Sequence, residues 1–182
     1  MSIIPGHPNL TQLGFVNPFI FITVEQSQPE TVFHPSRDAT VGRTNGSAEL
    51  ITYVTFNVPD ISNFPGANAN TKGFVIPLPS SVNQSGSKTV EIFDLQPGVT
   101  LPTSMTFDDR LEPNNNLSTV TFGGPNGLTP VEMDSFVQAT PNFGGTQSFE
   151  IRATGDNAAI TFSVNPVDIQ PNGVVFVIAN VS

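Results

Sequence analysis

Apolar and polar residues alternate with a period of two along much of the chain, which is the pattern of β-strands with one buried face. The clearest case is the stretch of residues 148–164, where the turn sequence TGDN at residues 154–157 separates two alternating runs. Gly and Asn tolerate the positive φ angles of a tight turn. We therefore predict a β-hairpin here, with Phe149 and Ile151 facing inward and Glu150 facing water.

Further strands are expected where short runs rich in Val, Ile, Phe and Thr lie between Gly, Pro and Asn residues. These runs cover residues 19–24, 49–58, 74–78, 89–93, 118–122 and 174–179. The first and the last run are apolar on both faces, which predicts central strands that are covered on both sides. Pro77 cannot donate a hydrogen bond to a neighbouring strand, so it predicts an edge or a bulge in its run.

One segment has the pattern of a helix. The sequence TPVE at residues 129–132 matches a capping box with proline at the first helical position, and apolar residues with helical spacing follow up to Val137. Together, about eight or nine strands and at most one short helix predict an all-β fold, an antiparallel β-sandwich with Greek-key or jelly-roll-like connections. We expect residues 17–182 to form a single domain after an N-terminal arm of residues 1–16.

The composition narrows the range of functions. The chain has 182 residues with a net charge of −9, and it contains 15 Phe, one Tyr, no Trp and no Cys. The absence of cysteine excludes disulfides, thiolate nucleophiles and cysteine metal sites. The few Lys and Arg residues are scattered, which argues against nucleic acid or an anionic membrane as a partner. No apolar run approaches the roughly 20 residues of a membrane span, so membrane insertion is not expected.

Candidate catalytic groups are few. The only histidines are His7 and His34, each followed by proline as is typical of extended loops, and no serine stands in a nucleophile-elbow sequence. The glycine pair at residues 123–124 lacks the lysine and the helix of a phosphate loop. We therefore expect a protein that is not an enzyme and that has no cofactor.

The acidic residues Asp108, Asp109 and Glu112 are followed by three asparagines, and such oxygen atoms are the ligands that calcium prefers. The spacing is not that of an EF-hand, so these residues are weak calcium candidates, and a solvated acidic loop is the simpler interpretation. Paired carboxylates that act as the acid and base of a small hydrolase are a third interpretation.

Two further sets of residues have the character of surface sites. Phe64 and Phe143 stand in loop-like contexts and are candidates for an exposed contact surface, although the core is the alternative place for them. Asn45, Asn83 and Asn116 begin Asn-x-Ser/Thr sequences in expected loops, where N-linked glycans can be attached. Glycans at these positions would indicate an exported protein.

Three stretches of the chain are similar to the fungal But-two C-terminal domain family. Residues 50–59 (LITYVTFNVP) resemble its strand ending in FNFDIP, residues 73–79 (GFVIPLP) resemble the next strand, and residues 171–178 (PNGVVFVI) resemble its closing strand. The resemblance implies a secreted or cell-surface β-sandwich and brings no catalytic residues. Members of this family usually carry cysteines, so their disulfide has no counterpart here.

The leading hypothesis is a non-enzymatic, extracellular or cell-wall β-sandwich with a structural or adhesive binding role. The N-terminus lacks the basic start and apolar run of a signal peptide, so either the protein does not use that export route or the sequence is a mature segment. A module that binds a glycan or a small apolar ligand is one alternative. A self-assembling, coat-like subunit is another, and a glycan or a protein at the cell surface is the expected partner.

Overall fold

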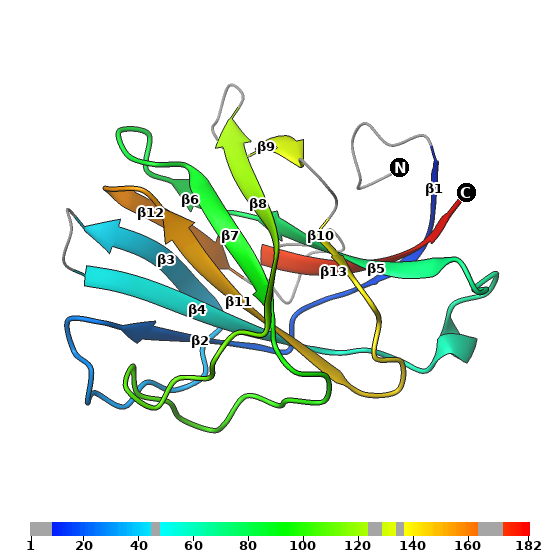
Figure 1. Cartoon of the computed structure of the whole chain (residues 1–182), viewed down its shortest axis with the longest axis horizontal. Coiled ribbons are helices and arrows are strands. Elements are labelled where there is room, and N and C mark those ends of the chain that lie inside the picture. The colour runs from blue at the N-terminus through cyan, green and yellow to red at the C-terminus, as the bar shows by residue number, and fades with distance from the viewer. Residues whose placement is uncertain (1–8, 45–47, 124–128, 134–136, 164–172) are drawn as a thin grey trace.

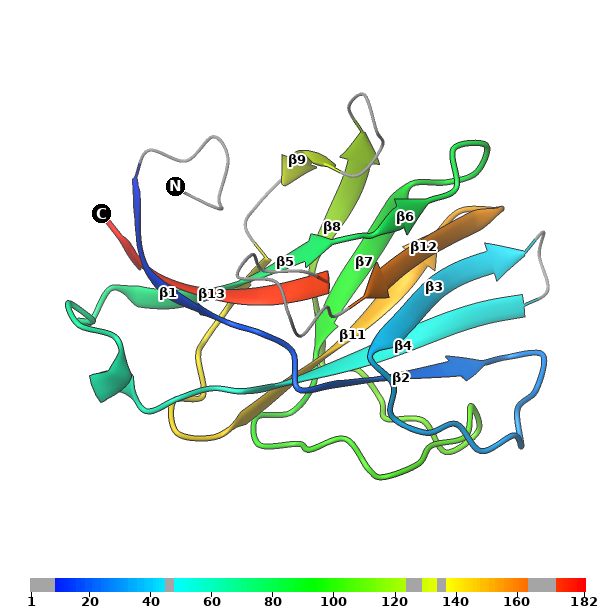
Figure 2. The same ribbon diagram turned by 180° about the vertical axis from the view of Figure 1, so that it is seen from behind.

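The computed structural model describes residues 9–44, 48–123, 129–133, 137–163 and 173–182, which form two antiparallel sheets (Figures 1 and 2). The smaller sheet has the strand order β1 (Leu10–Val16), β13 (Gly173–Val181), β5 (Thr71–Leu78) and β10 (Val137–Ala139). The larger sheet has the order β6 (Ser81–Val82), β12 (Ala158–Ser163), β3 (Asp38–Thr44), β4 (Ala48–Asn57), β11 (Thr146–Thr154), β7 (Thr89–Asp94), β8 (Asn115–Gly123) and β9 (Thr129–Met133). In addition, β2 (Ile20–Glu25) pairs with β4, and a short 3-10 helix, η1 (Ile61–Asn63), follows β4. The predicted fold class, an all-β sandwich, is confirmed.

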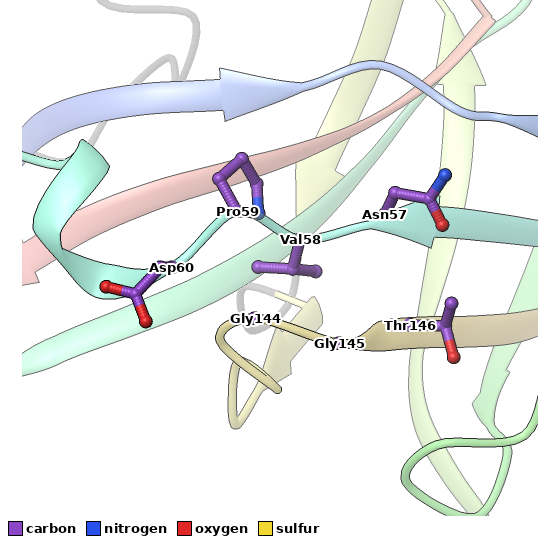
Figure 3. A pocket seen from close by; sticks show the side chains of 7 residues that line it. All are labelled: Asn57, Val58, Pro59, Asp60, Gly144, Gly145 and Thr146. Carbon is purple, nitrogen blue, oxygen red and sulfur yellow. The ribbon is translucent and has the colours of Figure 1, made fainter.

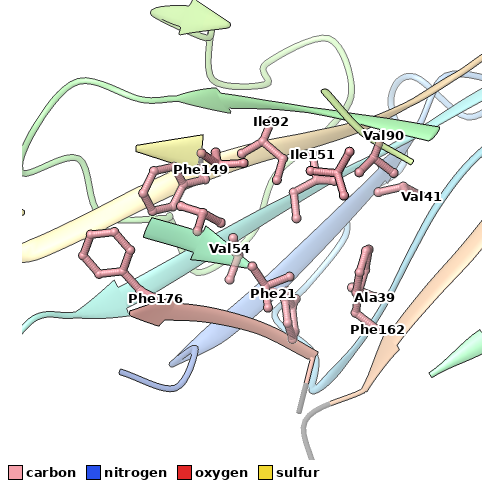
Figure 4. Close-up of a cluster of buried hydrophobic side chains, with 14 of the residues drawn as sticks. Phe21, Ala39, Val41, Val54, Val90, Ile92, Phe149, Ile151, Phe162 and Phe176 are labelled. Atoms are coloured by element: carbon pink, nitrogen blue, oxygen red, sulfur yellow. The ribbon is translucent and has the colours of Figure 1, made fainter. Parts of the chain in front are cut away.

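The main core lies between the two sheets (Figure 4). The apolar positions of β4, β7, β8 and β11 face those of β5 and β13 across it. Phe176 of β13 packs with Phe56 and Phe149 of the larger sheet, and its ring centroid lies 5.7 Å from each of theirs. Aromatic rings at this separation add to the free energy gained from their burial. Alternating apolar residues on both sheets, with Phe176 between two rings of the larger sheet, therefore join them.

Strands that are apolar on both faces behave differently in the two sheets. β13 lies between β1 and β5 and is buried on both sides, as the sequence predicts for a central strand. β2 is also covered on both faces, but among the described strands it pairs only with β4.

β5 is an inner strand, yet β10 pairs only with its residues Gly73–Val75. Pro77 therefore has a described neighbouring strand on one side only, which suits its missing N–H.

The predicted hairpin of residues 148–164 is wrong in its pairing. The turn between β11 and β12 is as expected, with φ of 81° at Gly155 and 57° at Asn157. However, β11 is flanked by β4 and β7, while β12 pairs with β3 and β6. Because both edges of β11 are occupied, β12 joins another part of the curled sheet. Alternation determines which side chains are buried, but it does not determine which strands pair.

The predicted helix at residues 129–137 is also wrong. Residues 129–133 form β9, which pairs with β8, residues 137–139 form β10, and residues 134–136 lie outside the described part. Pro130 lies on the last strand of the sheet, beside a register shift, where its missing N–H does not interrupt a ladder. A capping pattern is a weak preference, and pairing with β8 outweighs it.

The described residues contain thirteen strands, more than the eight or nine expected. The additional strands are short or weakly alternating, such as the two-residue β6 and the Gly- and Thr-containing β3. The expected N-terminal arm contains one of them, because residues 10–16 form β1 and pair with β13. No helix among the described residues has the length and hydrophobicity needed to cross a lipid bilayer.

A long irregular segment covers the outer face of the larger sheet. This segment, residues 95–114, is called the strap here and is the long green loop at the bottom of Figure 1. Its ends are held together where the amide of Asn114 donates to the carbonyl of Asp94 at 2.9 Å. A second apolar cluster forms beneath it, from Leu95, Leu101, Met105 and Phe107 of the strap and Ile22, Val24, Ile51 and Tyr53 of the sheet.

Candidate functional site

The three carboxylates considered for calcium lie exposed on the strap. Among the described residues, no group of three or more His, Asp or Glu side chains is arranged to hold a metal ion. Asp109 accepts a hydrogen bond from the hydroxyl of Thr106 at 3.2 Å, while its own amide donates to that hydroxyl at 3.0 Å. Asp109 also lines a shallow hollow of about 270 Å³ beside Val32. Its contacts stabilise a local turn of the strap, and Asp108 and Glu112 do not converge with it on a common site.

Of the two residues considered for an exposed contact surface, Phe64 is buried, whereas Phe143 keeps part of its side chain exposed. Phe64 is only 6% exposed and belongs to the main core. Phe143 is half-buried against that core, and the two ring centroids are 5.9 Å apart. The prediction is wrong for Phe64 because the connection from β4 to β5 folds back over the core, where a Cβ atom on Gly14 of β1 would lie only 3.0 Å from its ring.

The glycosylation candidates differ in how their side-chain amides are used. Asn116 is exposed at the start of β8, rather than in the expected loop, and its amide donates to Glu91 at 3.2 Å. Asn83 is half-buried, and its amide donates to the carbonyl of Asn157 at 2.8 Å. Asn45 lies outside the described residues. A glycan at Asn116 therefore disturbs less of the structure than one at Asn83.

The histidines provide no catalytic pair among the described residues. His34 is exposed, and its Nδ1 lies 3.3 Å from the carbonyl oxygen of Thr103 on the strap. His7 lies outside the described part of the chain. His34 is thus a contact between two loops.

An open cleft of about 410 Å³ lies at one end of the sandwich, where β4 ends and β11 begins (Figure 3). It is lined by Asn57, Val58, Pro59, Asp60, Gly144, Gly145 and Thr146. The two walls meet because backbone hydrogen bonds between the two segments continue beyond the end of β4 and the beginning of β11. The amide of Val58 donates to the carbonyl of Gly145 at 2.9 Å, and the amide of Gly144 donates to the carbonyl of Val58 at 3.1 Å. The cleft is therefore held by the sheet itself.

A glycine turn forms one wall of this cleft. The amide of Gly145 donates to the carbonyl of Asn142 at 3.1 Å and closes the turn, in which Gly144 has a φ of 74°. A Cβ atom on Gly145 would lie 2.6 Å from the side-chain nitrogen of Asn142. Both positions thus favour glycine, and the absence of side chains lets a ligand approach the backbone closely.

Asp60 is the charged residue of the cleft lining. Its Oδ1 accepts a hydrogen bond from the amide of Ser62 at 2.9 Å, as the N-cap of η1. This backbone bond, together with the Ser62 side chain, holds the pKa of the carboxyl below its ordinary value, so Asp60 is ionised at neutral pH. Figure 3 shows Asp60 at one end of the cleft and the side chains of Asn57 and Thr146 at the other. The lining thus offers a carboxylate, an amide and a hydroxyl.

A second polar group is enclosed beneath the strap. Glu150 has no exposed surface and forms an ion pair with Arg152, which lies two residues further along β11. The guanidinium of Arg152 lies 5.2 Å from the centroid of the Phe93 ring. Directly opposite Glu150 on β4, Tyr53 donates its hydroxyl hydrogen to the carbonyl of Leu111 on the strap at 2.9 Å. The expectation that Glu150 faces water is wrong because the strap covers this face of the sheet.

Burial, reinforced by the negative charge of Glu150, raises the pKa of Tyr53 well above its ordinary value. Burial disfavours the charged form of Arg152, but its hydrogen bond to Glu150 and the charge of Glu150 outweigh this and raise its pKa. Within the described structure, Glu150 Oε2 and the Nε of Arg110 are buried without a hydrogen-bond partner. The strap closes over Glu150 and is held there by the hydrogen bond from Tyr53 to Leu111, so we interpret this polar group as part of the strap's attachment and the end cleft as the site open to a ligand.

Neither the cleft nor the buried ion pair follows from a local motif. Pro59-Asp60 has the character of a strand end and Gly144-Gly145 that of a turn, and only the pairing of β4 with β11 brings the two segments together. Glu150 alternates with apolar neighbours as a solvated residue does. The sequence feature that could have indicated the burial of Glu150 is the long segment between β7 and β8, which is rich enough in Leu, Met and Phe to cover a sheet face.

Comparison of the sequence with protein-family models and with curated proteins finds no match. The fold and the site define an antiparallel β-sandwich with an open, polar cleft at one end. The resemblance to the But-two C-terminal domain family stays a prediction.

Proposed function

We propose that the protein is a non-catalytic binding domain of the cell surface or the extracellular space, and that its end cleft binds a hydroxyl-rich ligand such as a glycan. The observation that supports this most is the composition of the cleft around ionised Asp60. Sugar hydroxyls both donate and accept hydrogen bonds, and a carboxylate, an amide and a hydroxyl complement them. A hydrogen bond from a sugar hydroxyl to Asp60 is charge-assisted and therefore stronger than a neutral one.

The way in which the cleft is built supports a binding role. Its walls are the paired ends of β4 and β11, so little order has to be gained when a ligand enters. The cleft is open and has no Trp or Tyr platform, which favours weak binding at each single site. An adhesive protein of this kind gains strength from several copies acting together.

A catalytic role has less support. Glycoside hydrolysis needs two carboxyl groups on opposite sides of the scissile bond, separated by roughly 5–9.5 Å. The seven residues that line the cleft include one carboxylate, that of Asp60, and no histidine. Glu150 is enclosed beneath the strap and does not line the cleft.

The binding proposal is tested on a glycan array and then by titration of each binding glycan against two variants. Asp60→Asn creates an Asn-x-Ser sequence at residues 60–62, so both variants are produced in a host that attaches no N-linked glycans. In Asp60→Asn the cap of η1 is kept, because asparagine also accepts the amide hydrogen bond, but the charge is lost. Loss of a charge-assisted hydrogen bond predicts about ten- to hundredfold weaker binding. Asp156→Asn is the matched control, since Asp156 is exposed in the turn at the far end of β11. An array without any binding glycan, or equal binding by both variants, contradicts the proposal.

The proposed location is tested on protein purified from its natural source. Intact mass and glycopeptide mapping should find a glycan at Asn116, which is exposed and bonded to the side chain of Glu91, in preference to Asn83, which is half-buried and bonded to the backbone of Asn157. Unmodified sequons on the natural protein would remove the support that they give to an extracellular location.

A further inference from the structure

A hollow of about 270 Å³ lies where the strap meets the connection from β2 to β3. This strap hollow is lined by Val32 of that connection and by Pro102, Ser104, Met105, Thr106 and Asp109 of the strap. None of these residues lines the end cleft. Pockets for drug-sized ligands have volumes of roughly 300–1,000 Å³, so the smaller strap hollow suits a single side chain.

Backbone hydrogen bonds hold the two sides of the strap hollow together. The amide of Phe33 donates to the carbonyl of Met105 at 2.8 Å, and the amide of Met105 donates to the carbonyl of Phe33 at 2.9 Å. The amide of Asp108 donates to the carbonyl of Pro29 at 3.2 Å. The walls are therefore in place before a ligand enters, which lowers the entropy cost of binding.

One part of the lining is apolar and open to solvent. Val32 is 53% exposed and is one of the most exposed large apolar side chains of the described chain. Pro102 is also exposed, and Met105 is buried between them and the cluster beneath the strap. An alkyl chain in the hollow covers Val32 and Pro102, and the removal of this apolar surface from water favours binding.

Asp109 supplies the charge of the strap hollow. The hydroxyl of Thr106 donates to its Oδ2 at 3.2 Å and so fixes the position of the carboxylate. Within the described part of the chain the only ion pair is that of Glu150 with Arg152, so no cation of that part neutralises Asp109. An exposed carboxylate beside an apolar wall complements a cationic group at the end of an alkyl chain.

We propose that the strap hollow receives a lysine side chain of a partner protein, with the methylene groups of the lysine against Val32 and its ammonium group at Asp109. An ammonium group has three donors, and the carboxylate of Asp109 and the hydroxyl of Ser104 are acceptors in the lining. Arginine suits the hollow less. Its planar fork pairs best with two carboxylate oxygens, and Thr106 already donates to one of those of Asp109.

The surrounding charge supports a basic protein as the source of the lysine. Asp108 and Glu112 lie on the strap close to Asp109 in the sequence, and both are exposed. The whole chain has a net charge of −9, which attracts a basic surface and repels a second copy of the same chain. A lysine presented by a protein gains from these further charges, whereas a small free amine gains only from the hollow. This interaction does not depend on what the end cleft binds.

The test is an NMR titration of the full, isotope-labelled chain with a blocked pentapeptide that has one lysine between alanines. The amides of Val32, Met105 and Asp109 should shift and saturate, with a Kd on the order of 1 mM for so small a contact. Asp109→Asn should weaken binding at least about fivefold, because the charge-assisted hydrogen bond is lost. Asp108→Asn is the matched control, since it removes the same charge at a neighbouring residue that does not line the hollow.

Val32→Ser tests the apolar wall separately and should weaken binding about two- to fivefold. Because Val32 and Asp109 are exposed, both variants should fold, and the spectrum of each variant verifies this. Absence of saturating shifts at the hollow overturns the proposal. Equal losses in Asp109→Asn and Asp108→Asn would indicate general attraction to an acidic surface and also overturn it.

Three further probes define the ligand. Pentapeptides with arginine or norleucine in place of the lysine should bind at least about threefold more weakly, because the first has the wrong shape of cation and the second has no charge. Equal binding by either peptide overturns the assignment of a lysine. Butylamine should also bind more weakly than the lysine peptide. Butylamine binding as tight as that of the peptide overturns the protein partner and assigns the hollow to a free amine.

Discussion

The two faces of β4 and β11 are both buried, but they are buried in different ways. The inner face meets the smaller sheet, and the residues that it contributes to the main core, such as Phe56 and Phe149, are apolar. The outer face meets the strap, and there polar residues lie among the apolar ones. Ser148, Glu150 and Tyr53 belong to this outer face.

The difference follows from what covers each face. A second sheet satisfies its own backbone groups by strand pairing, so it can be met by apolar side chains alone. An irregular segment brings unpaired carbonyl groups, and when buried these need donors. The outer face supplies them, since the hydroxyl of Ser148 donates to Val99 at 2.8 Å and that of Tyr53 donates to Leu111 at 2.9 Å. Ser148 and Tyr53 therefore bond to the strap instead of the solvent.

The largest expected effect on stability comes from a variant of the main core, which we compare with a matching variant of the cluster beneath the strap. Phe176→Ala removes a ring that is held between two others from the opposite sheet, and it should lower the free energy of unfolding by about 3–5 kcal/mol. Phe107→Ala removes a ring of the same size from the strap, where an irregular chain can collapse into the space, so we expect less than half that loss. Urea denaturation of both variants measures the two values. Equal losses would show that the strap packs as rigidly as the second sheet.

A smaller effect is expected from the ion pair beneath the strap. Arg152→Met leaves the charge of Glu150 buried without its partner, which should cost about 2–3 kcal/mol, since a quarter of the Arg152 side chain remains exposed and softens the penalty. The double variant Glu150→Gln/Arg152→Met should recover part of this loss. Arg43→Met, at an exposed position of β3, is the control with little expected effect. A loss in Arg152→Met no greater than in this control would mean that water reaches Glu150.

The contrast between the two faces also explains what the sequence could predict about the fold. Strands that meet another sheet, such as β4, β11 and β13, are visible because regular burial imposes a period of two on their residues. β3 was missed since its buried residues, Ala39 and Val41, are small and few. The pairing of β11 and β12 was predicted wrongly because it depends on which edges are already occupied, and no local pattern records this.

Predictions about the site failed for a related reason. The cleft joins Asp60 to Gly144 through the pairing of strands that are far apart in the sequence. We predicted that Glu150 faces water because the strap that covers it has no periodic sequence pattern. Alternation alone cannot distinguish solvent from an irregular segment of chain. What the sequence did indicate was the absence of cysteine and of clustered cations, together with the all-β architecture in which the cleft arises.

The smallest effect tests whether the face beneath the strap is as dry as the main core. Tyr53 is the only tyrosine and the chain has no tryptophan, so the near-ultraviolet absorbance of tyrosinate reports on this residue alone. Tyr53→Phe loses the hydrogen bond to Leu111 and should cost about 1 kcal/mol at neutral pH.

The pH dependence of Tyr53 is the sharper form of this test. Its pKa in the folded chain is raised above the ordinary value of 10.0, so the folded state holds the proton more tightly than the unfolded state. The corresponding stability is complete below pH 10.0 and is lost above it, at about 1.4 kcal/mol per pH unit, until the folded pKa is reached. Tyrosinate should therefore appear only with unfolding, and Tyr53→Phe should unfold at higher pH than the wild type. Ionisation near pH 10.0 in a chain that is still folded would mean that the strap opens, and the outer face would then be a wet surface beneath a loose cover.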